Sequence, residues 1–310
     1  MMSQKIAIDA GHGYVKALSQ SGQRYRFPSL ICSMPPNVDL GGLGKQESVT
    51  IDGVRYLIGE PARAHATPLW SHEKSTDSDT LRLILVAAVH LGGVGPVTLA
   101  TGLPLAWFGS QRRAFREALT GFGSTVQLPG QPPQRLWFES VTVLPQGVAA
   151  AASVLSSAEY EPGSYLIVDI GYRTTDYIVV VKSEDGGLDY EPGAAGSLEM
   201  GMHNVSQPVV HAVNDQYQVA YSASEVEVRA TVVVRGQKID VSQRMRDARQ
   251  TVGRRLAQEL AATMGPQLDK LMGIVAVGGG ADILSPVLPG IMVPADPQWG
   301  NVIGYQMMLE

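Results

Sequence analysis

Two stretches of the chain, Lys5-Ile-Ala-Ile-Asp-Ala-Gly-His-Gly13 and Tyr165-Leu-Ile-Val-Asp-Ile-Gly171, decide the expected fold. Each is an apolar run that ends in Asp, one further residue and Gly, and each is followed by a second apolar run. Two strands joined by a tight glycine turn form a hairpin. The same hairpin therefore occurs twice in 310 residues, which predicts a chain of two duplicated lobes.

Around the hairpins, further strand-like runs alternate with helix-like segments. Strands are expected at 97–100, 136–144 and 273–277, and helices at 81–91, 110–119, 201–214, 224–232 and 240–264. The alternation predicts an α/β class, and the hairpins make the sheets mixed rather than purely parallel. We expect lobe I to hold residues 1–156, completed by 285–310, and lobe II to hold residues 157–284.

The amino-acid composition and the net charge exclude several classes of function. The formal net charge is −5, which argues against a surface that grips bare nucleic acid, so we expect no direct nucleic-acid binding. The single cysteine, Cys32, cannot form an internal disulfide, and no Cys/His spacing suits zinc. We find no signal-like N-terminal pattern and no apolar run long enough to span a bilayer, and we therefore expect a cytoplasmic protein without membrane contact.

The first hairpin carries the residue types that a nucleoside triphosphate with Mg²⁺ requires. Glycines such as Gly11 and Gly13 let backbone N–H groups approach phosphates closely. A carboxylate, here Asp9, holds hydrated Mg²⁺, and a cation such as Lys16 balances the terminal phosphates. The hairpin is therefore a candidate phosphate loop.

The second hairpin repeats these types. Asp169 and Gly171 stand in the same order, and two hydroxyls follow at Thr174 and Thr175. Each loop alone is also compatible with an ordinary glycine hairpin that has Asp in its turn. The shared Asp-x-Gly order after a buried strand favours a pair of loops that clamp phosphates from two sides.

A third glycine motif, Gly278-Gly-Gly280, follows an expected strand and precedes a helix. Such a run makes either a plain turn or a flat surface for a sugar or base, with a helix N-terminus nearby. Following two phosphate loops, it indicates the floor of an adenosine pocket. Neither a Walker P-loop nor a dinucleotide fingerprint is present.

In family order, these motifs resemble the actin/Hsp70/sugar-kinase ATPase superfamily, and within it the ParM/StbA plasmid-segregation actins and their archaeal relatives. The resemblance spans about Lys5 to Met308 and is carried by residues 8–16, 101–105, 143–147, 168–176, 277–281 and 297–305. It implies an actin-like (ribonuclease H-like) fold with a nucleotide cleft between the lobes, and ATP (or GTP) with Mg²⁺ as cofactors.

The resemblance also implies roles. Asp9 and Asp169 would position Mg²⁺, and Gln146 would orient the attacking water. The phosphates would be contacted from one lobe by Gly11, His12, Gly13 and Lys16, and from the other by Gly171, Thr174 and Thr175. The adenosine pocket would be lined by Gly278, Gly279 and Gly280.

Four residues leave alternatives open. His12 stands where Ser or Thr is common, so its imidazole either contacts phosphate or points out of the cleft. Arg173 points to the nucleotide, to solvent or to a neighbouring subunit. Asn301 and Tyr305 are expected to close the first lobe rather than to contact a ligand.

The function implied by the resemblance is an ATPase that self-associates into nucleotide-dependent filaments and moves plasmid DNA through an adaptor protein. One alternative is a non-polymerising ATPase of the same fold that acts as a chaperone-like or assembly scaffold. A small-molecule kinase is a third class, although we find no acceptor-binding base for it.

Overall fold

The computed structural model describes residues 3–34, 47–66, 73–74, 77–226, 230–288 and 290–309. The chain forms two compact units: unit 1 comprises residues 1–103, 107–144 and 305–310, and unit 2 comprises residues 104–106 and 145–304. The lobes expected from the sequence place residues 145–156 and 285–304 in the first lobe, whereas these residues belong to unit 2. The expected boundaries of the two lobes stay a prediction.

Unit 1 is built on one curled mixed sheet. Its elements are β1 (Gln4–Ala10), β2 (Tyr14–Ser19), β3 (Arg24–Pro28), β4 (Ile31–Ser33), β5 (Val49–Ile51), β6 (Val54–Ile58), α1 (Ser78–His90), β7 (Gly95–Leu103), α2 (Leu105–Leu119), β8 (Gly123–Gln127) and β9 (Gln134–Pro145). The described strands pair in the order β3-β2-β1-β7-β9-β8-β5-β6-β4. The β1–β2 hairpin expected from the sequence is confirmed, and β7 pairs with β1 in parallel.

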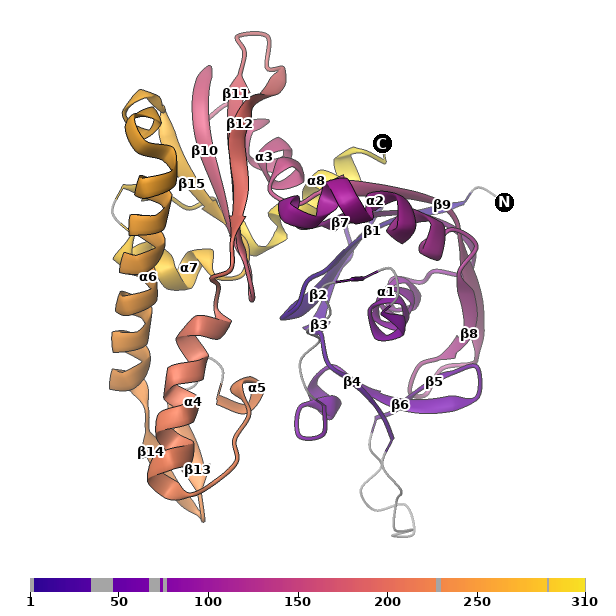
Figure 1. Cartoon of the computed structure of the whole chain (residues 1–310). Coiled ribbons are helices and arrows are strands. Elements are labelled where there is room, and N and C mark those ends of the chain that lie inside the picture. Colours follow the sequence, from indigo (N-terminus) through magenta and orange to yellow (C-terminus); the bar gives the residue numbers. More distant parts are fainter. Residues whose placement is uncertain are drawn as a thin grey trace. The chain divides into compact units, whose positions relative to one another are not determined.

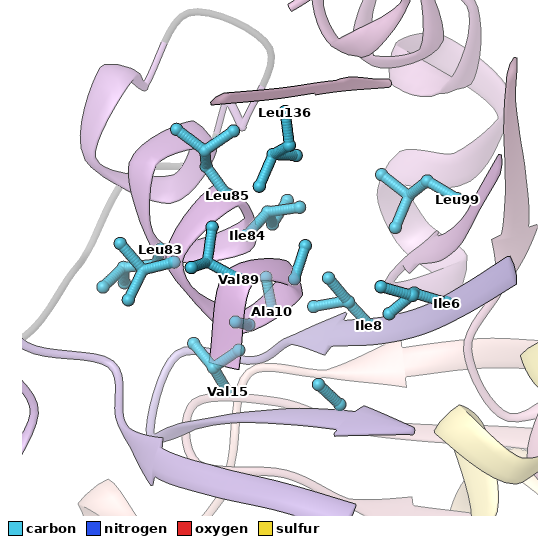
Figure 2. Packing of buried hydrophobic residues seen from close by; sticks show 14 of the residues in the cluster. Ile6, Ile8, Ala10, Val15, Leu83, Ile84, Leu85, Val89, Leu99 and Leu136 are labelled. Atoms are coloured by element: carbon cyan, nitrogen blue, oxygen red, sulfur yellow. The ribbon is translucent and has the colours of Figure 1, made fainter. Parts of the chain in front are cut away.

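Helix α1 fills the inside of this curled sheet (Figure 1). Its residues from Leu83 to Val89 are all buried, as is typical of a helix enclosed on every side. Figure 2 shows its side chains packed with residues of the strands, among them Ile8 and Leu99. The helix starts at its N-cap Asp77, whose carboxylate accepts a hydrogen bond from the Asp79 N–H at 3.1 Å.

The end of the chain also belongs to unit 1. Tyr305, in α8 (Gly300–Met307), is fully buried against β7. A Cβ at Gly102 would lie 1.9 Å from the Tyr305 hydroxyl oxygen, so only glycine fits beside this ring. The residues of α8 before Tyr305 belong to unit 2.

Unit 2 repeats the strand pattern of unit 1. Its elements are α3 (Val148–Leu155), β10 (Gly163–Ile170), β11 (Thr175–Lys182), β12 (Leu188–Leu198), α4 (His203–Tyr217), α5 (Ala223–Val226), β13 (Thr231–Val234), β14 (Gln237–Asp240), α6 (Ser242–Met264), β15 (Gly273–Val277), α7 (Ala281–Leu284) and β16 (Ile291–Met292). The sheet order is β12-β11-β10-β15-β16. In both units an antiparallel three-strand meander is followed by a parallel strand beside its first strand, which is the duplication that the two hairpins predicted.

Helices cover both faces of this second sheet. Side chains alternate along a strand, so Tyr165 and Ile167 of β10 pack with α3, whereas Leu166 and Val168 pack in the cluster that includes α4 and α6. Helices α4 and α6 lie against each other (Figure 1). The centre of β10 is therefore buried on both faces, which explains why its sequence is continuously apolar.

One expected helix is wrong. Residues 224–232 were expected to be helical, but α5 ends at Val226 and Thr231 begins the β13–β14 hairpin. Three consecutive valines favour a strand, and Arg235 and Gly236 form the turn with positive φ angles of 49° and 81°. Among the described helices, none has the length and apolar character needed to cross a membrane.

Candidate functional site

The first hairpin places a carboxylate opposite an ammonium group. Asp9 is the second-last residue of β1, and Lys16 lies directly across from it on β2. The Lys16 Nζ donates to Asp9 Oδ2 at 2.9 Å, and the side chains are only 11% and 4% exposed. Such a buried pair is held in one geometry, because either charge alone would be left without compensation.

The turn of this hairpin is fixed by close contacts of its backbone. A Cβ at Gly11 would lie 3.0 Å from the Tyr14 carbonyl oxygen, which favours glycine there. Ser29, just after β3, donates from its Oγ to the Gly11 carbonyl at 2.5 Å and from its N–H to the Gly13 carbonyl at 2.9 Å. The carbonyl groups of the loop are therefore drawn toward the body of unit 1.

His12 lies at the tip of the same loop. Its ring packs edge-on against Trp107 of α2, with 5.6 Å between centroids, and the side chain is half-buried. It also lines a small pocket in unit 1 that is formed by Ala10, Gly11, His12, Lys74, Asp77, Thr80 and Leu83. The imidazole is thus part of the loop's packing, and a phosphate contact by His12 stays a prediction.

Lys74 is a residue of this half-site that sequence reasoning missed. It is 3% exposed, and its Nζ donates to the Ala10 carbonyl at 2.5 Å. In the sequence it stands in a polar run before the N-cap of α1, where a lysine gives no sign of being buried. Only the tertiary structure brings it to the Asp9–Gly13 loop.

The second hairpin places two carboxylates opposite each other. Asp169 is the second-last residue of β10 and faces Asp176 on β11, and both are buried. Neutral groups hold them: the Asn301 side-chain amide donates to Asp169 Oδ2 at 2.6 Å, and the Leu105 N–H donates to Asp176 Oδ2 at 3.1 Å. Ser197 donates to the other oxygen of Asp176. Two carboxylates so close together concentrate negative potential, which favours binding of a cation.

The turn of the second hairpin repeats the first in its backbone contacts. A Cβ at Gly171 would lie 2.9 Å from the Thr174 carbonyl oxygen, and the Gly171 N–H donates to that oxygen at 2.9 Å. Thr174 and Thr175 are buried, and the Thr175 hydroxyl donates to the Met200 carbonyl at 2.7 Å. The Thr175 hydroxyl is thereby committed to the segment before α4.

The Gly278–Gly280 motif packs directly on the end of β10. Strand β15 runs parallel to β10 with Val277 beside Asp169. At Gly278, φ is +86° and a Cβ would lie 2.2 Å from Asp169 Oδ1, and a Cβ at Gly280 would lie 2.5 Å from the Ile170 side chain. A Cβ at Gly279 would meet nothing within 4 Å. Two of the three glycines are therefore required by packing, and Gly279 is open to a larger group.

Gln146 joins this second half-site through Asn301. The Asn301 Oδ1 accepts from the Gly147 N–H at 3.0 Å while its amide nitrogen holds Asp169. One side chain thus ties the residue after Gln146 to the carboxylate of Asp169, and Gln146 itself is buried. The expectation that Asn301 closes the first lobe rather than contacting a ligand stays a prediction, and it did not include this contact with Asp169.

Arg173 is buried rather than pointing to solvent. Its side chain is 7% exposed, and its Nε lies 3.4 Å from the carboxylate of Glu199. Burial and the nearby Arg173 charge both lower the pKa of His203, the first residue of α4. The His203 ring packs against Tyr172, and the Tyr172 carbonyl accepts from the His203 N–H at 2.8 Å. The 171–175 loop is therefore braced against the start of α4.

The structure brings the expected residues together in two groups. Unit 1 holds Asp9, Gly11, His12, Gly13 and Lys16, and unit 2 holds Gln146, Asp169, Gly171, Thr174, Thr175, Gly278, Gly279 and Gly280. The described residues hold no cluster of three or more His, Cys, Asp or Glu side chains that would bind a metal. The facing carboxylates of unit 2 suit Mg²⁺, which takes one or two carboxylates and completes its shell with water and phosphate oxygens.

Two family models match the chain over most of its length. The N-terminal domain of actin-like proteins matches residues 7–148, and the C-terminal domain of archaeal MreB-like actin homologues matches residues 167–290. The chain belongs to the actin-like proteins. The first matched range includes the loop at residues 9–13, and the second includes the loop at residues 169–175.

This actin-like chain is similar to other proteins over nearly its full length. An archaeal actin homologue of Thermoplasma acidophilum is 23% identical, with 98% of each chain covered. Among solved structures, a 15-stranded ParM filament from Clostridium botulinum matches with a TM-score of 0.84 at 22% identity, and an archaeal actin homologue in complex with ADP matches with 0.78 at 20%, each with 99% of both chains covered. At these identities the structures establish the actin-like fold.

Proposed function

We propose that the chain is an ATPase that binds ATP (or GTP) with Mg²⁺ between two lobes and assembles into nucleotide-dependent filaments. The observation that carries the proposal is the repeated hairpin, which has a buried aspartate near the end of its first strand. This residue is Asp9 in the first copy and Asp169 in the second. The archaeal homologue solved with ADP shares this fold, which supports a nucleotide as the ligand.

Each half-site supplies a different part of the chemistry in this proposal. Gly11, His12, Gly13 and Lys16 would contact phosphates, since glycines admit close N–H groups and Lys16 adds a cation. Asp9 and Asp169 would hold Mg²⁺ through water, with Gly171, Thr174 and Thr175 beside the phosphates. Mg²⁺ would neutralise charge that develops during phosphoryl transfer.

Gln146 and the third glycine motif complete the proposed site. A neutral amide such as Gln146 orients an attacking water without taking a full charge, and Asn301 fixes the adjoining backbone at Gly147. Gly278, Gly279 and Gly280 would lie beneath adenosine, with Gly279 facing the nucleoside, because a Cβ at Gly279 meets no protein atom.

For the cellular role we propose that filaments move or position plasmid DNA in the cytoplasm through an adaptor protein. The ParM filament with the same fold supports self-association. Head-to-tail contacts that do not close into a ring would give a polar filament. An adaptor is needed because a net charge of −5 does not favour direct contact with DNA.

Two measurements test the proposal in sequence. Calorimetry with ATP, GTP and Mg²⁺ is expected to show binding to the purified chain, and absence of affinity for either nucleotide would overturn the site. Light scattering and negative-stain microscopy are then expected to show filaments with ATP and Mg²⁺ and none without nucleotide. Flat scattering over a concentration series with nucleotide bound would favour the non-polymerising scaffold instead.

A further inference from the structure

A buried cation outside the recognised motifs supports the first phosphate loop. Lys74 is 3% exposed, and its Nζ lies 2.5 Å from the carbonyl oxygen of Ala10, between Asp9 and Gly11. Burying an ammonium group is costly unless hydrogen bonds and charges offset the lost hydration. The Lys74 ammonium group therefore holds the peptide between Ala10 and Gly11 in one orientation.

The direction of the peptide follows from its planarity. In a trans peptide the C=O and the N–H of the next residue point to opposite sides. Because Lys74 holds the Ala10 carbonyl, the Gly11 N–H points away from Lys74. Ser29 holds the Gly11 carbonyl at 2.5 Å, so the His12 N–H likewise points away from Ser29. Two successive N–H groups are thus oriented by side chains outside the loop.

Lys74 and Lys16 contact different parts of the first hairpin. Lys16 is paired with Asp9 at 2.9 Å, so its charge is already balanced within the hairpin. Lys74 lines the small pocket with Gly11 and His12, and Asp77 in the same pocket accepts hydrogen bonds from the Asp79 N–H and the Thr80 hydroxyl at the start of α1.

We propose that Lys74 is a positioning residue for nucleotide phosphates, acting by holding the Ala10 peptide so that the Gly11 N–H faces the phosphate. The inference rests on the proposed nucleotide site and names a residue that none of its motifs contains. A positioning role predicts that the phosphate-bearing part of the ligand, and not the nucleoside, senses the loss of Lys74.

The test is calorimetric titration of wild type and Lys74→Met with two probes, ATP with Mg²⁺ and adenosine. We expect the ATP affinity of Lys74→Met to fall about tenfold, equivalent to about 1.4 kcal/mol, with adenosine affinity unchanged. The exposed lysine of β14 gives the matched control, Lys238→Met, which is expected to bind both probes like wild type. Lys74→Arg, which retains a cationic donor, is expected to recover part of the ATP affinity.

The outcomes distinguish failure of the positioning role of Lys74 from failure of the proposed nucleotide site. Unchanged ATP affinity in Lys74→Met, or an equal loss for adenosine, would overturn the positioning role while leaving the nucleotide site intact. Wild type that bound neither probe would overturn both. If Lys74→Met does not fold, Ser29→Ala tests the same orientation of the loop, with an expected loss of about threefold for ATP alone. Unchanged ATP affinity in Ser29→Ala would then count against the proposal that side chains outside the loop orient its N–H groups toward phosphate.

Discussion

The two Asp-x-Gly hairpins have similar backbone turns and differ in charge. In each, a glycine lies where a Cβ would approach the carbonyl oxygen three residues later, at 3.0 Å for Gly11 and 2.9 Å for Gly171. In each, the aspartate that stands second-last in the first strand faces one residue on the second strand. That residue is Lys16 opposite Asp9, but Asp176 opposite Asp169.

The difference shows which property of the repeat is structural and which is chemical. The glycine follows from the close turn, so any hairpin of this shape requires it in both copies. The residue that faces the aspartate differs between the two copies although the turn is the same. It sets the charge of the hairpin near its turn. We infer that the first copy, which has a lysine opposite its aspartate, is suited to anions, whereas the second, with two facing carboxylates, is suited to a cation.

The largest expected effect is on catalysis by the second hairpin. Asp169→Asn is expected to lower ATP turnover by about 100-fold or more, the order of magnitude for loss of one preorganised electrostatic group. A steady-state phosphate-release assay with saturating Mg²⁺ measures it. The exposed Asp215→Asn on α4 is the control, and turnover in Asp169→Asn equal to that of Asp215→Asn would remove Asp169 from the metal site.

The same substitution should have different effects on stability in the two hairpins. Asp9→Asn leaves the largely buried Lys16 unpaired and is expected to lower the free energy of unfolding by about 2–3 kcal/mol. Asp169→Asn relieves repulsion from Asp176 and is expected to leave it unchanged or raise it. Urea unfolding without nucleotide measures both, and equal losses would contradict the difference in charge that we infer.

A smaller effect is expected where the second hairpin depends on Asn301. Asn301→Ala removes a donor at 2.6 Å from Asp169 and an acceptor for the Gly147 N–H. Turnover is expected to fall about tenfold through misplacement of Gln146 and Asp169, and stability by about 1–2 kcal/mol. Asn204→Ala, which removes a cap contact at the start of α4, is a suitable comparison because it should affect stability without a matching loss of turnover.

The smallest expected effect is on the pH dependence of stability, and it concerns His90 at the end of α1. Burial lowers the pKa of His90 to about 4, where its ring stacks on Tyr25 of β3 at 4.0 Å. A histidine with a lowered pKa contributes stability that is complete above its ordinary value of 6.5 and is lost as the pH falls toward 4. Because the ring is partly exposed, we expect His90→Gln to reduce this loss by only about 1 kcal/mol.

Unfolding curves at pH 7 and pH 4.5 measure this effect as a difference between the two conditions. His65→Gln, at an exposed position, provides the reference and is expected to keep the pH dependence of wild type. The same dependence in His90→Gln as in His65→Gln would assign the acid sensitivity elsewhere, for example to His203 behind the second hairpin, whose pKa is also lowered.

The sequence predicted what is local and repeated. The hairpin at Lys5–Gly13, its copy at Tyr165–Gly171 and the α/β class follow from apolar runs, turn glycines and spacing, and the strand order bears them out. The actin-like resemblance rested on the same motifs. The helix expected over 224–232 failed because short apolar runs suit helix and strand equally, and Arg235-Gly236 is not a usual turn signal.

Contacts between distant segments were beyond sequence reasoning. Lys74 reaches Ala10 across 64 positions, and Asn301 reaches Asp169 across 132. Neither has a spacing or pattern that marks it, because its role depends on tertiary packing. Arg173 was expected to face solvent, a neighbouring subunit or the nucleotide, and its burial beside Glu199 depends equally on where β12 ends.

The buried ring of Tyr305 has a consequence for how the molecule is made. Unit 1 contains β1 and also needs Tyr305, a residue of α8, to occupy the space beside Gly102. During synthesis, the β1–β2 hairpin leaves the ribosome long before Tyr305 is translated. Unit 1 therefore cannot be completed until α8 has been made, and until then the surface around Gly102 stays uncovered.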